Sequence, residues 1–220
     1  MTTKPTTKQR ILVYGASGHA KVVIDIVERA GVAKIAFLVD DDPQIKGARF
    51  FDYRVLGGMN DLEAWLARNR AIGAIVAIGD NAARMRIAAG LKRKGLTLTC
   101  AVHPAACIGR DVAIGAGTVI MGGCAVNSDT IIGDNTIVNT GSTIDHDCTI
   151  GDGVHVAPGC HLCGDVTVGA GSILGAGTTV IPGVRIGANT VIGAGSTVLN
   201  DVADGARVAG SPARRLEGAR

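Results

Sequence analysis

Branched aliphatic residues recur at every sixth position through the second half of the chain. The series starts at Val102, ends at Val198 and holds 17 such residues without a slip. The residue four positions after each aliphatic one is small or β-branched, from Ala106 to Val202. This two-position rule with a six-residue period is typical of hexapeptide repeats, which fold as a parallel β-helix.

Each six-residue repeat is expected to form one short strand and one corner of a solenoid. The aliphatic side chain points inward, and glycine, which follows it in 8 of the 17 repeats, tolerates the backbone angles of a corner. Three repeats make a triangular coil of 18 residues, and successive coils stack about 4.8 Å apart as parallel strands. Residues 102–220 are therefore predicted to form an all-β domain of slightly fewer than six coils with a short C-terminal tail.

The first hundred residues show a different pattern, in which buried apolar runs alternate with helical periodicity. Such alternation favours a small Rossmann-like α/β domain with an open parallel sheet, and we assign it to residues 1–101. The predicted strands cover residues 10–14, 33–39, 53–56, 74–78 and 96–102, and the predicted helices cover residues 19–30, 61–68 and 82–91.

The composition agrees with a narrow aliphatic core in the second domain. Hydrophobic residues make up 47% of the chain, but aromatic residues only 3%, and 32 of the 220 residues are glycine. Large aromatic rings would not fit inside so small a coil. The chain has six prolines and no Gly-X-Y period, which excludes a collagen-like protein.

Hydropathy and charge predict a soluble protein that binds a small anion. No apolar run approaches the roughly 20 residues of a membrane span, and no signal-like apolar segment follows the charged N-terminus, so we expect a cytoplasmic protein. The net charge of +3 is too small to indicate nucleic-acid binding. Residues 1–101 hold 16 basic and 9 acidic residues (net +7), whereas residues 102–220 hold 6 and 10 (net −4). This division favours an anionic ligand on the first domain, although part of the positive charge could be a solvated helix face.

A glycine turn between the first predicted strand and helix is the candidate anion site. The turn covers residues 15–19, where backbone amides and the helix dipole favour a phosphate. The acidic cluster at residues 40–42 follows the second strand and suits a ribose or base edge. The glycine spacing matches neither the dinucleotide fingerprint nor a Walker loop, so the alternative is a turn with a purely structural role.

Histidines interrupt the solenoid pattern, and His146 is the candidate general base. It is flanked by Asp145 and Asp147, either of which could fix its tautomer and make the other ring nitrogen more basic. The alternative is an exposed histidine in a turn. His161 is interpreted as an ordinary corner residue. Cys160 and Cys163 form a CxxC, but they occupy non-equivalent repeat positions, which argues against a metal or redox pair.

Several motifs together resemble one family over about residues 9–215. It is the group of nucleotide-sugar acetyltransferases that includes sialic-acid O-acetyltransferases and bacillosamine-pathway N-acetyltransferases. The motifs that resemble it are Tyr14-Gly-Ala-Ser-Gly-His-Ala-Lys21, Leu38-Val-Asp-Asp41, Ala77-Ile-Gly-Asp-Asn81, Val102-His-Pro-Ala105, Asp145-His-Asp147 and Gly210-Ser-Pro-Ala-Arg214.

The resemblance implies a left-handed β-helix, acetyl-CoA as co-substrate, no metal, and a homotrimer with active sites between subunits. The implied acceptor is the C4 amine of a nucleotide-linked 4-amino-4,6-dideoxy sugar, with GDP-perosamine as the expected substrate, in O-antigen or lipopolysaccharide biosynthesis. It further implies these roles: catalysis by His146 and Asp147; substrate binding by Ser17, Gly18, His19, Asp40, Asp41, Gly79 and Asn139; acetyl-CoA binding by His155, Ala176 and Ala194.

The sequence departs from the family pattern at three of these positions. Asp147 stands where the family commonly has the longer Glu, and Ala176 and Ala194 replace glycines. Three alternatives stay open at this point: O-acetylation of a sugar of the sialic-acid type, a solenoid scaffold, and a trimeric metal protein using His146, His155 and His161. The role of Arg214 and Arg215 is also open.

Overall fold

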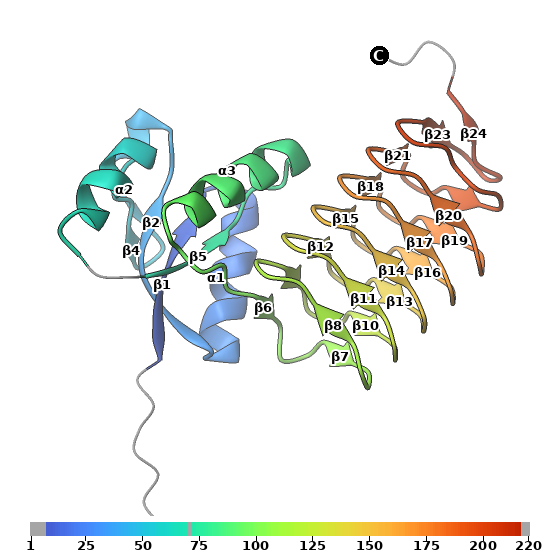
Figure 1. Cartoon of the computed structure of the whole chain (residues 1–220), viewed down its shortest axis with the longest axis horizontal. Helices are drawn as coiled ribbons and strands as arrows, with labels where there is room; N and C mark the ends of the chain where they lie inside the picture. Colours follow the sequence, from blue (N-terminus) through green and yellow to red (C-terminus); the bar gives the residue numbers. More distant parts are fainter. Residues whose placement is uncertain (1–7, 70–71, 217–220) are drawn as a thin grey trace, which may run out of the picture.

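The chain folds into an α/β domain followed by a β-solenoid (Figure 1). This computed structural model describes residues 8–69 and 72–216. The α/β domain contains β1 (Gln9–Tyr14), α1 (Gly18–Ala30), β2 (Ala33–Val39), the short 3-10 helix η1 (Pro43–Ile45), β3 (Arg49–Phe50), β4 (Tyr53–Arg54), α2 (Met59–Leu66), β5 (Gly73–Val76) and α3 (Asn81–Arg93).

The predicted parallel sheet is present, with the order β2-β1-β5. The last four residues of β1 are fully buried, and α1 covers them with an apolar face that includes Val23, Ile24 and Val27. Helix α1 ends at Gly31, whose φ of 62° closes the helix in the left-handed conformation. Single bridges extend the sheet at both edges, from Leu38 to Val55 and from Ala74 to Leu98.

Two predicted strands are shorter than the sequence pattern suggested. In place of a strand over 53–56, β3 and β4 form a small antiparallel hairpin, because the amide of Val55 bonds back to Ala48 and its carbonyl accepts from Gly47. In place of a strand over 96–102, only Leu98 bridges the sheet before the chain leaves for the first coil at β6 (Ala101–Val102). Residues that alternate like a strand are used here as a connection between domains.

The solenoid consists of two-residue strands that each pair with the strand one coil later. For example, Ile137 and Val138 pair with His155 and Val156, 18 residues further on. Three parallel sheets result, in the orders β22-β19-β16-β13-β10-β7, β20-β17-β14-β11-β8 and β23-β21-β18-β15-β12-β9-β6, with β24 added antiparallel to β23. The strands are β7 (Cys107–Ile108), β8 (Ala113–Ile114), β9 (Val119–Ile120), β10 (Ala125–Val126), β11 (Ile131–Ile132), β12 (Ile137–Val138), β13 (Thr143–Ile144), β14 (Thr149–Ile150), β15 (His155–Val156), β16 (His161–Leu162), β17 (Thr167–Val168), β18 (Ile173–Leu174), β19 (Thr179–Val180), β20 (Arg185–Ile186), β21 (Val191–Ile192), β22 (Thr197–Val198), β23 (Arg207–Ala209) and β24 (Arg214–Arg215).

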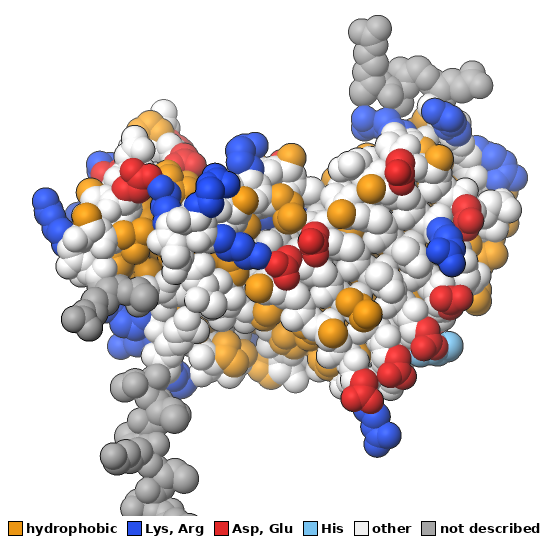
Figure 2. All heavy atoms as spheres, viewed as in Figure 1, with side chains coloured by type: hydrophobic (Ala, Val, Ile, Leu, Met, Phe, Trp, Pro, Cys, Tyr) orange, Lys and Arg blue, Asp and Glu red, His pale blue; other side chains and the backbone are white. Residues whose placement is uncertain are grey.

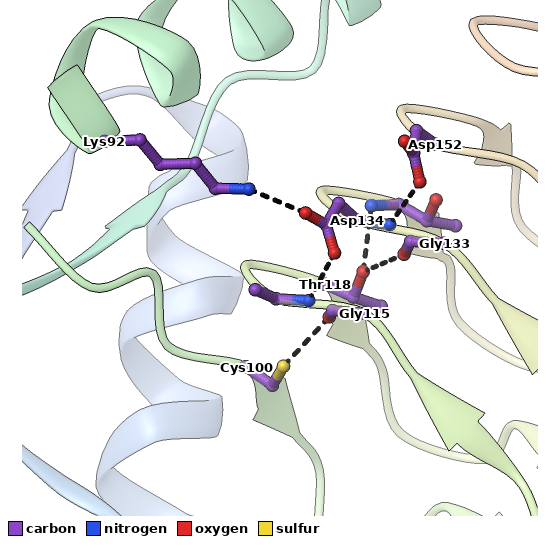
Figure 3. Close-up of polar contacts among 9 residues, drawn as sticks. Lys92, Cys100, Gly115, Thr118, Gly133, Asp134 and Asp152 are labelled. Atoms are coloured by element: carbon purple, nitrogen blue, oxygen red, sulfur yellow. Dashed lines mark hydrogen bonds and ion pairs between the residues drawn. The ribbon is translucent and has the colours of Figure 1, made fainter.

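The inward positions confirm the two-residue rule of the repeat. Every aliphatic residue of the series from Ile120 to Val198 is buried, whereas Val102, Ile108 and Ile114 in the first coil are only partly covered. The small position holds buried hydroxyls and thiols that bond to carbonyls of the next coil. Thr118, for example, donates to the carbonyl of Gly133 at 2.7 Å (Figure 3). A buried polar atom costs little when it is hydrogen-bonded in this way.

The two domains share one hydrophobic core and several polar contacts. Buried residues of α1 and β1 belong to the same cluster as the solenoid residues Ala101, Val119 and Ile120. Helix α3 also contacts the coils, and Lys92 on its exposed side pairs with Asp134 at 2.6 Å (Figure 3). In the described part of the chain, no helix has the length and apolar character needed to cross a membrane.

Candidate active site

The glycine turn after β1 is fixed by its backbone surroundings. Gly15 has a φ of +115°, and a Cβ built on it would lie 2.7 Å from the carbonyl oxygen of Ala77. Its amide donates to Val39, and the amide of Ala16 donates to a carboxylate oxygen of Asp40 at 2.7 Å. Backbone contacts and the Asp40 carboxylate therefore hold the turn in this conformation.

The same turn leaves the start of α1 open. Ser17 is the N-cap residue, but its side chain makes no capping hydrogen bond, and nothing lies within 4 Å of a Cβ on Gly18. Gly79, in the turn after β5, is equally open. Because the carboxyl ends of parallel strands meet at one edge of a sheet, these residues lie together with Asp40, as ligand sites in such sheets do.

The carboxylates of Asp40 and Asp41 accept hydrogen bonds from protein groups at this edge of the sheet. Asp41 accepts from the hydroxyl of Tyr14 at 2.7 Å and from the amide of Met59 at 3.0 Å, and Asp40 also accepts from the amide of Asp42. Burial and the bond to Asp41 raise the pKa of Tyr14. Next to this pair is a cavity of about 420 Å³ with three cationic side chains, which sequence reasoning did not single out. Its lining is Tyr14, Asp41, Met59, Arg86, Ile87, Gly90, Arg93 and Lys94.

His19, Asn139 and His155 come together where the two domains meet. The amide nitrogen of Asn139 lies 3.2 Å from Nε2 of His155. Burial, followed by the charge of Arg84, lowers the pKa of His155 to about 4, and burial together with His155 and Arg84 lowers the pKa of His19 to about 4. Both imidazoles are therefore neutral at physiological pH. Nε2 of His19 is buried and has no hydrogen-bond partner among the described residues.

Ala176 and Ala194 lie along the same edge of the solenoid as Asn139. They are exposed, they are one coil apart, and they follow β18 and β21 as residue 140 follows β12. The carbonyl of Ala176 accepts from the amide of Gly195 at 2.8 Å, which continues the stacking of the coils. Ala176 and Ala194 have only methyl side chains, which leaves the backbone of this part of the edge accessible to a long, narrow ligand.

His146 and Asp147 form a dyad in the turn between β13 and β14. Nδ1 of His146 lies 2.6 Å from Oδ2 of Asp147, and both side chains are more than 60% exposed. The hydrogen bond to Asp147, followed by charge interactions with Asp147, Asp145 and Asp165, raises the pKa of His146. Asp145 accepts instead from Asn127 at 2.7 Å, so of the two flanking carboxylates it is Asp147 that contacts the imidazole. With Nδ1 occupied, Nε2 of His146 is left to take a proton.

The backbone conformation of Asp147 recurs at the same corner of other coils. Its φ is 61°, and the residues at the same corner of three other coils, Asp111, Asp129 and Asp165, have φ values of 58°, 61° and 58°. Figure 2 shows acidic side chains and a histidine gathered along one edge of the solenoid. What distinguishes this coil is the histidine before the aspartate and the glycine at residue 164, one coil later. A Cβ on Gly164 would lie 2.8 Å from Nε2 of His146. Stepping 18 residues from His146 in the sequence would have revealed this glycine.

The structure divides the candidate residues between two regions. One region contains the α/β turns with Asn139, His155, Ala176 and Ala194. The other contains the His146–Asp147 dyad, at the corner between β13 and β14, whereas His155 lies on β15 in the sheet of β6, β9 and β12. A single chain does not bring the dyad and His155 into one site.

The remaining candidate residues from the sequence are His161, the two cysteines of the CxxC and the two arginines near the C-terminus. His161 is exposed, and its Nδ1 lies 3.0 Å from the hydroxyl of Thr143. Cys160 is fully buried and Cys163 is half-buried, as expected for non-equivalent positions. Among residues 8–69 and 72–216, no three His, Cys, Asp or Glu side chains are grouped to hold a metal ion. Arg214 and Arg215 on β24 are exposed and line a cavity of about 300 Å³ at the end of the solenoid.

Comparison with known proteins gives both domains a family. Residues 10–91 match the PglD N-terminal domain, and residues 129–164, 147–181 and 165–200 match the bacterial transferase hexapeptide family, described as six repeats. A histidine-to-asparagine variant of perosamine N-acetyltransferase from Caulobacter crescentus, solved in complex with CoA and GDP-perosamine, is 37% identical with a TM-score of 0.89. The match covers 94% of this chain and 96% of that one. The chain belongs to the hexapeptide-repeat sugar acetyltransferases.

Two further solved structures are similar to the chain over both of its domains. The acetyltransferase domain of PglB from Neisseria gonorrhoeae FA1090 is 32% identical with a TM-score of 0.87, and the match covers 95% of this chain and all of that one. WeeI from Acinetobacter baumannii AYE is 27% identical with a TM-score of 0.85, over 95% of this chain and all of that one. The comparison with curated proteins found no match.

Family membership confirms the predicted fold and reaction class. The solenoid is a left-handed parallel β-helix, and the protein is an acyltransferase that uses acetyl-CoA to acetylate a sugar. The PglB domain has been solved in complex with acetyl coenzyme A.

Proposed function

We propose that this acetyltransferase transfers the acetyl group to the C4 amine of a nucleotide-linked 4-amino-4,6-dideoxy sugar, with GDP-perosamine as the expected acceptor. The observation on which the proposal depends is the contact of 2.6 Å between Nδ1 of His146 and Asp147. It leaves Nε2 of a strengthened base exposed to solvent. The perosamine N-acetyltransferase of Caulobacter crescentus was solved with GDP-perosamine, which supports an amino sugar as the acceptor.

The proposed reaction is direct transfer from thioester to amine. The neutral amine attacks the thioester carbonyl carbon of acetyl-CoA, the C–N bond forms, and Nε2 of His146 takes the proton that the nitrogen loses. The C–S bond then breaks and CoA leaves as a thiolate. Asp147 stabilises the imidazolium that forms. No acyl-enzyme is required, and burial raises the pKa of the thiols of Cys124, Cys148 and Cys160, which makes them poor nucleophiles.

The nucleotide is proposed to bind at the open edge of the α/β sheet. The amide end of α1 at Ser17 and Gly18 suits the diphosphate. Arg86 and Arg93 in the neighbouring cavity add positive charge for the same group or face the base. Asp40 and Asp41 use some of their lone pairs within the protein, and the remaining ones are available to a ribose hydroxyl or a base N–H.

We infer that the active site is completed by a second copy of the chain in a homotrimer. The dyad of one subunit would face Asn139 and His155 of the next, because the two regions lie on different faces of one solenoid. The sugar would reach from the α/β domain across the subunit boundary to Nε2 of His146. Mixed trimers that combine a chain lacking His146 with a chain lacking His155 test this arrangement.

An acetyl-transfer assay that measures CoA release tests the reaction and the substrate together. GDP- and UDP-linked 4-amino-4,6-dideoxy sugars are compared with matched sugars that carry a hydroxyl in place of the amine. We expect GDP-perosamine to have the highest kcat/KM. Faster turnover of a hydroxyl acceptor would overturn the N-acetyltransferase assignment and favour O-acetylation.

The role of His146 is tested by its substitution in the same assay. His146→Ala should lower kcat by roughly 10²–10⁴-fold, the usual contribution of a general base. His161→Ala is the matched control, because this histidine is also exposed on the solenoid but contacts only Thr143 among the polar groups described. Turnover near that of the wild type in the His146 variant would exclude it as the base.

A further inference from the structure

Arg84 is a buried guanidinium at the boundary between the two domains. It lies on α3 and is 1% exposed. In the described part of the chain, no carboxylate lies within ion-pair distance of it. Removing an unpaired charge from water is expensive, so such a residue is retained only where many hydrogen bonds hold it.

All five N–H groups of Arg84 are matched by acceptors. Nε donates to the carbonyl of Asn135 at 2.8 Å, and one terminal nitrogen donates to the carbonyls of Ile78 and Gly79 at 3.1 and 2.9 Å. The other terminal nitrogen donates to the side chain of Asn81 at 2.7 Å and to the carbonyl of Gly153 at 2.9 Å. The fixed fork of arginine is needed to reach acceptors in this many directions.

These acceptors connect the α/β domain to three successive coils. Asn135 and Gly153 are 18 residues apart, and the amide of Asn81 continues the series by donating to the carbonyls of Gly171 and Ser172 at 2.9 and 3.1 Å. The contact at Gly79 lies in the turn that faces the proposed nucleotide site. Gly153 lies two residues before His155, at the proposed acetyl-CoA site. One side chain therefore links the two sites that one substrate molecule has to bridge.

We propose that Arg84 is a positioning residue that fixes the nucleotide-binding turns relative to the acetyl-transfer site on the solenoid. The inference rests on the proposed nucleotide-linked acceptor. Binding energy from the remote nucleotide accelerates the reaction only if it holds the amine in the reacting geometry. If the α/β domain shifts by about 1 Å relative to the acetyl-transfer site, the nucleotide no longer holds the amine in that geometry, and the rate can fall by about 100-fold. A sugar 1-phosphate, which lacks the nucleoside and one phosphate, has fewer contacts with the α/β domain and gains less from its placement.

The test compares two acceptors on the same enzyme preparation. These are the GDP-linked 4-amino sugar and the corresponding 4-amino sugar 1-phosphate, which lacks the nucleoside. Arg84→Lys keeps the charge but loses the fork. We expect the ratio of kcat/KM for the nucleotide-linked acceptor to that for the 1-phosphate to fall at least about 10-fold. A loss of folded protein lowers both activities equally and leaves this ratio unchanged, so the readout separates positioning from stability.

Two further variants sharpen the comparison. Asn81→Ala removes the continuation to the third coil and one of the five acceptors of Arg84 without adding a buried charge, and it should lower the ratio in the same direction by a smaller factor. Lys92→Met is the matched control, because its exposed ion pair with Asp134 also joins α3 to the solenoid but should contribute little.

The outcomes distinguish the inference from the proposed function. A wild-type enzyme that favours the nucleotide-linked acceptor, combined with an unchanged ratio in Arg84→Lys and Asn81→Ala, would overturn the role of Arg84 alone. A wild-type enzyme that turns over both acceptors equally well would overturn the proposed nucleotide site and the inference with it.

Discussion

The imidazole of His146 lies over Gly164, the residue one full coil later, so closely that a Cβ on the glycine would come within 2.7 Å of the ring carbon Cε1 and 2.8 Å of Nε2. The imidazole of the proposed base can occupy this position only because residue 164 has no side chain. The contact involves the exposed end of a side chain and no backbone atom of His146. A methyl group at residue 164 would displace the ring and leave the coil intact.

Gly164→Ala should therefore lower activity without lowering stability. We expect kcat to fall roughly 10-fold, because the base is moved from its position relative to the amine, while the unfolding temperature stays close to that of the wild type. A kcat equal to that of the wild type in a fully folded Gly164→Ala variant would contradict the role of Gly164.

The pH profile should report the contact between His146 and Asp147. The hydrogen bond to Asp147 raises the pKa of His146, and only the neutral imidazole can accept the proton. Activity should therefore fall on the acid side with an apparent pKa above the ordinary histidine value of about 6.5. Asp147→Asn should move this limb to lower pH and reduce kcat at the plateau, because the base becomes weaker. The measurement is kcat/KM between pH 5 and 9, and a limb that stays in place would show that another group titrates.

The solenoid was predictable from the sequence because its rule is local and repeated. The same inward position is tested 17 times, so errors at one coil do not accumulate, and every aliphatic residue from Ile120 onward is buried as expected. The strand predicted over 53–56 is shorter in the structure, because an alternating pattern does not reveal that Val55 bonds to Ala48 in a hairpin. The local pattern predicts the type of element, but the segment to which it hydrogen-bonds determines the length of the element.

The candidate site was only partly predictable, for a related reason. His146 was visible because a histidine between two aspartates interrupts a regular pattern, but the choice of Asp147 over Asp145 depends on the contact of Asp145 with Asn127 in the preceding coil. Arg84 gave no signal, because a single arginine on an amphipathic helix is indistinguishable from a solvated one until its burial is known. The sequence does not reveal which residues make contacts between the domains.

Substitutions of two glycines at the edge of the α/β sheet should have different effects, one on stability and the other on nucleotide binding. Gly15→Ala forces a φ of +115° on alanine and places a methyl group 2.7 Å from the carbonyl of Ala77, so the free energy of unfolding should fall by about 2–3 kcal/mol. Gly79→Ala has open space around it and should leave stability unchanged. It should instead weaken the binding of GDP, because the methyl group projects from the turn at the proposed nucleotide site.

Chemical denaturation measures the first effect, and calorimetric titration with GDP measures the second. The two variants serve as controls for each other, since both add one methyl group to the same edge of the sheet. Normal GDP affinity in a fully folded Gly79→Ala variant would place the nucleotide elsewhere on the chain.

Mixed trimers should show whether one active site takes residues from two subunits. His146→Ala and His155→Ala are each expected to be nearly inactive as pure proteins, because every site lacks one histidine. When the two chains are co-expressed and assemble at random, a site formed by His146 of one subunit and His155 of its neighbour is intact in roughly a quarter of cases. Acetyl-transfer activity should then recover to about that fraction of the wild-type value, as measured by CoA release from purified mixed trimers. If each site lay within one chain, no combination would be intact, and the mixture would stay at the average of its inactive parents.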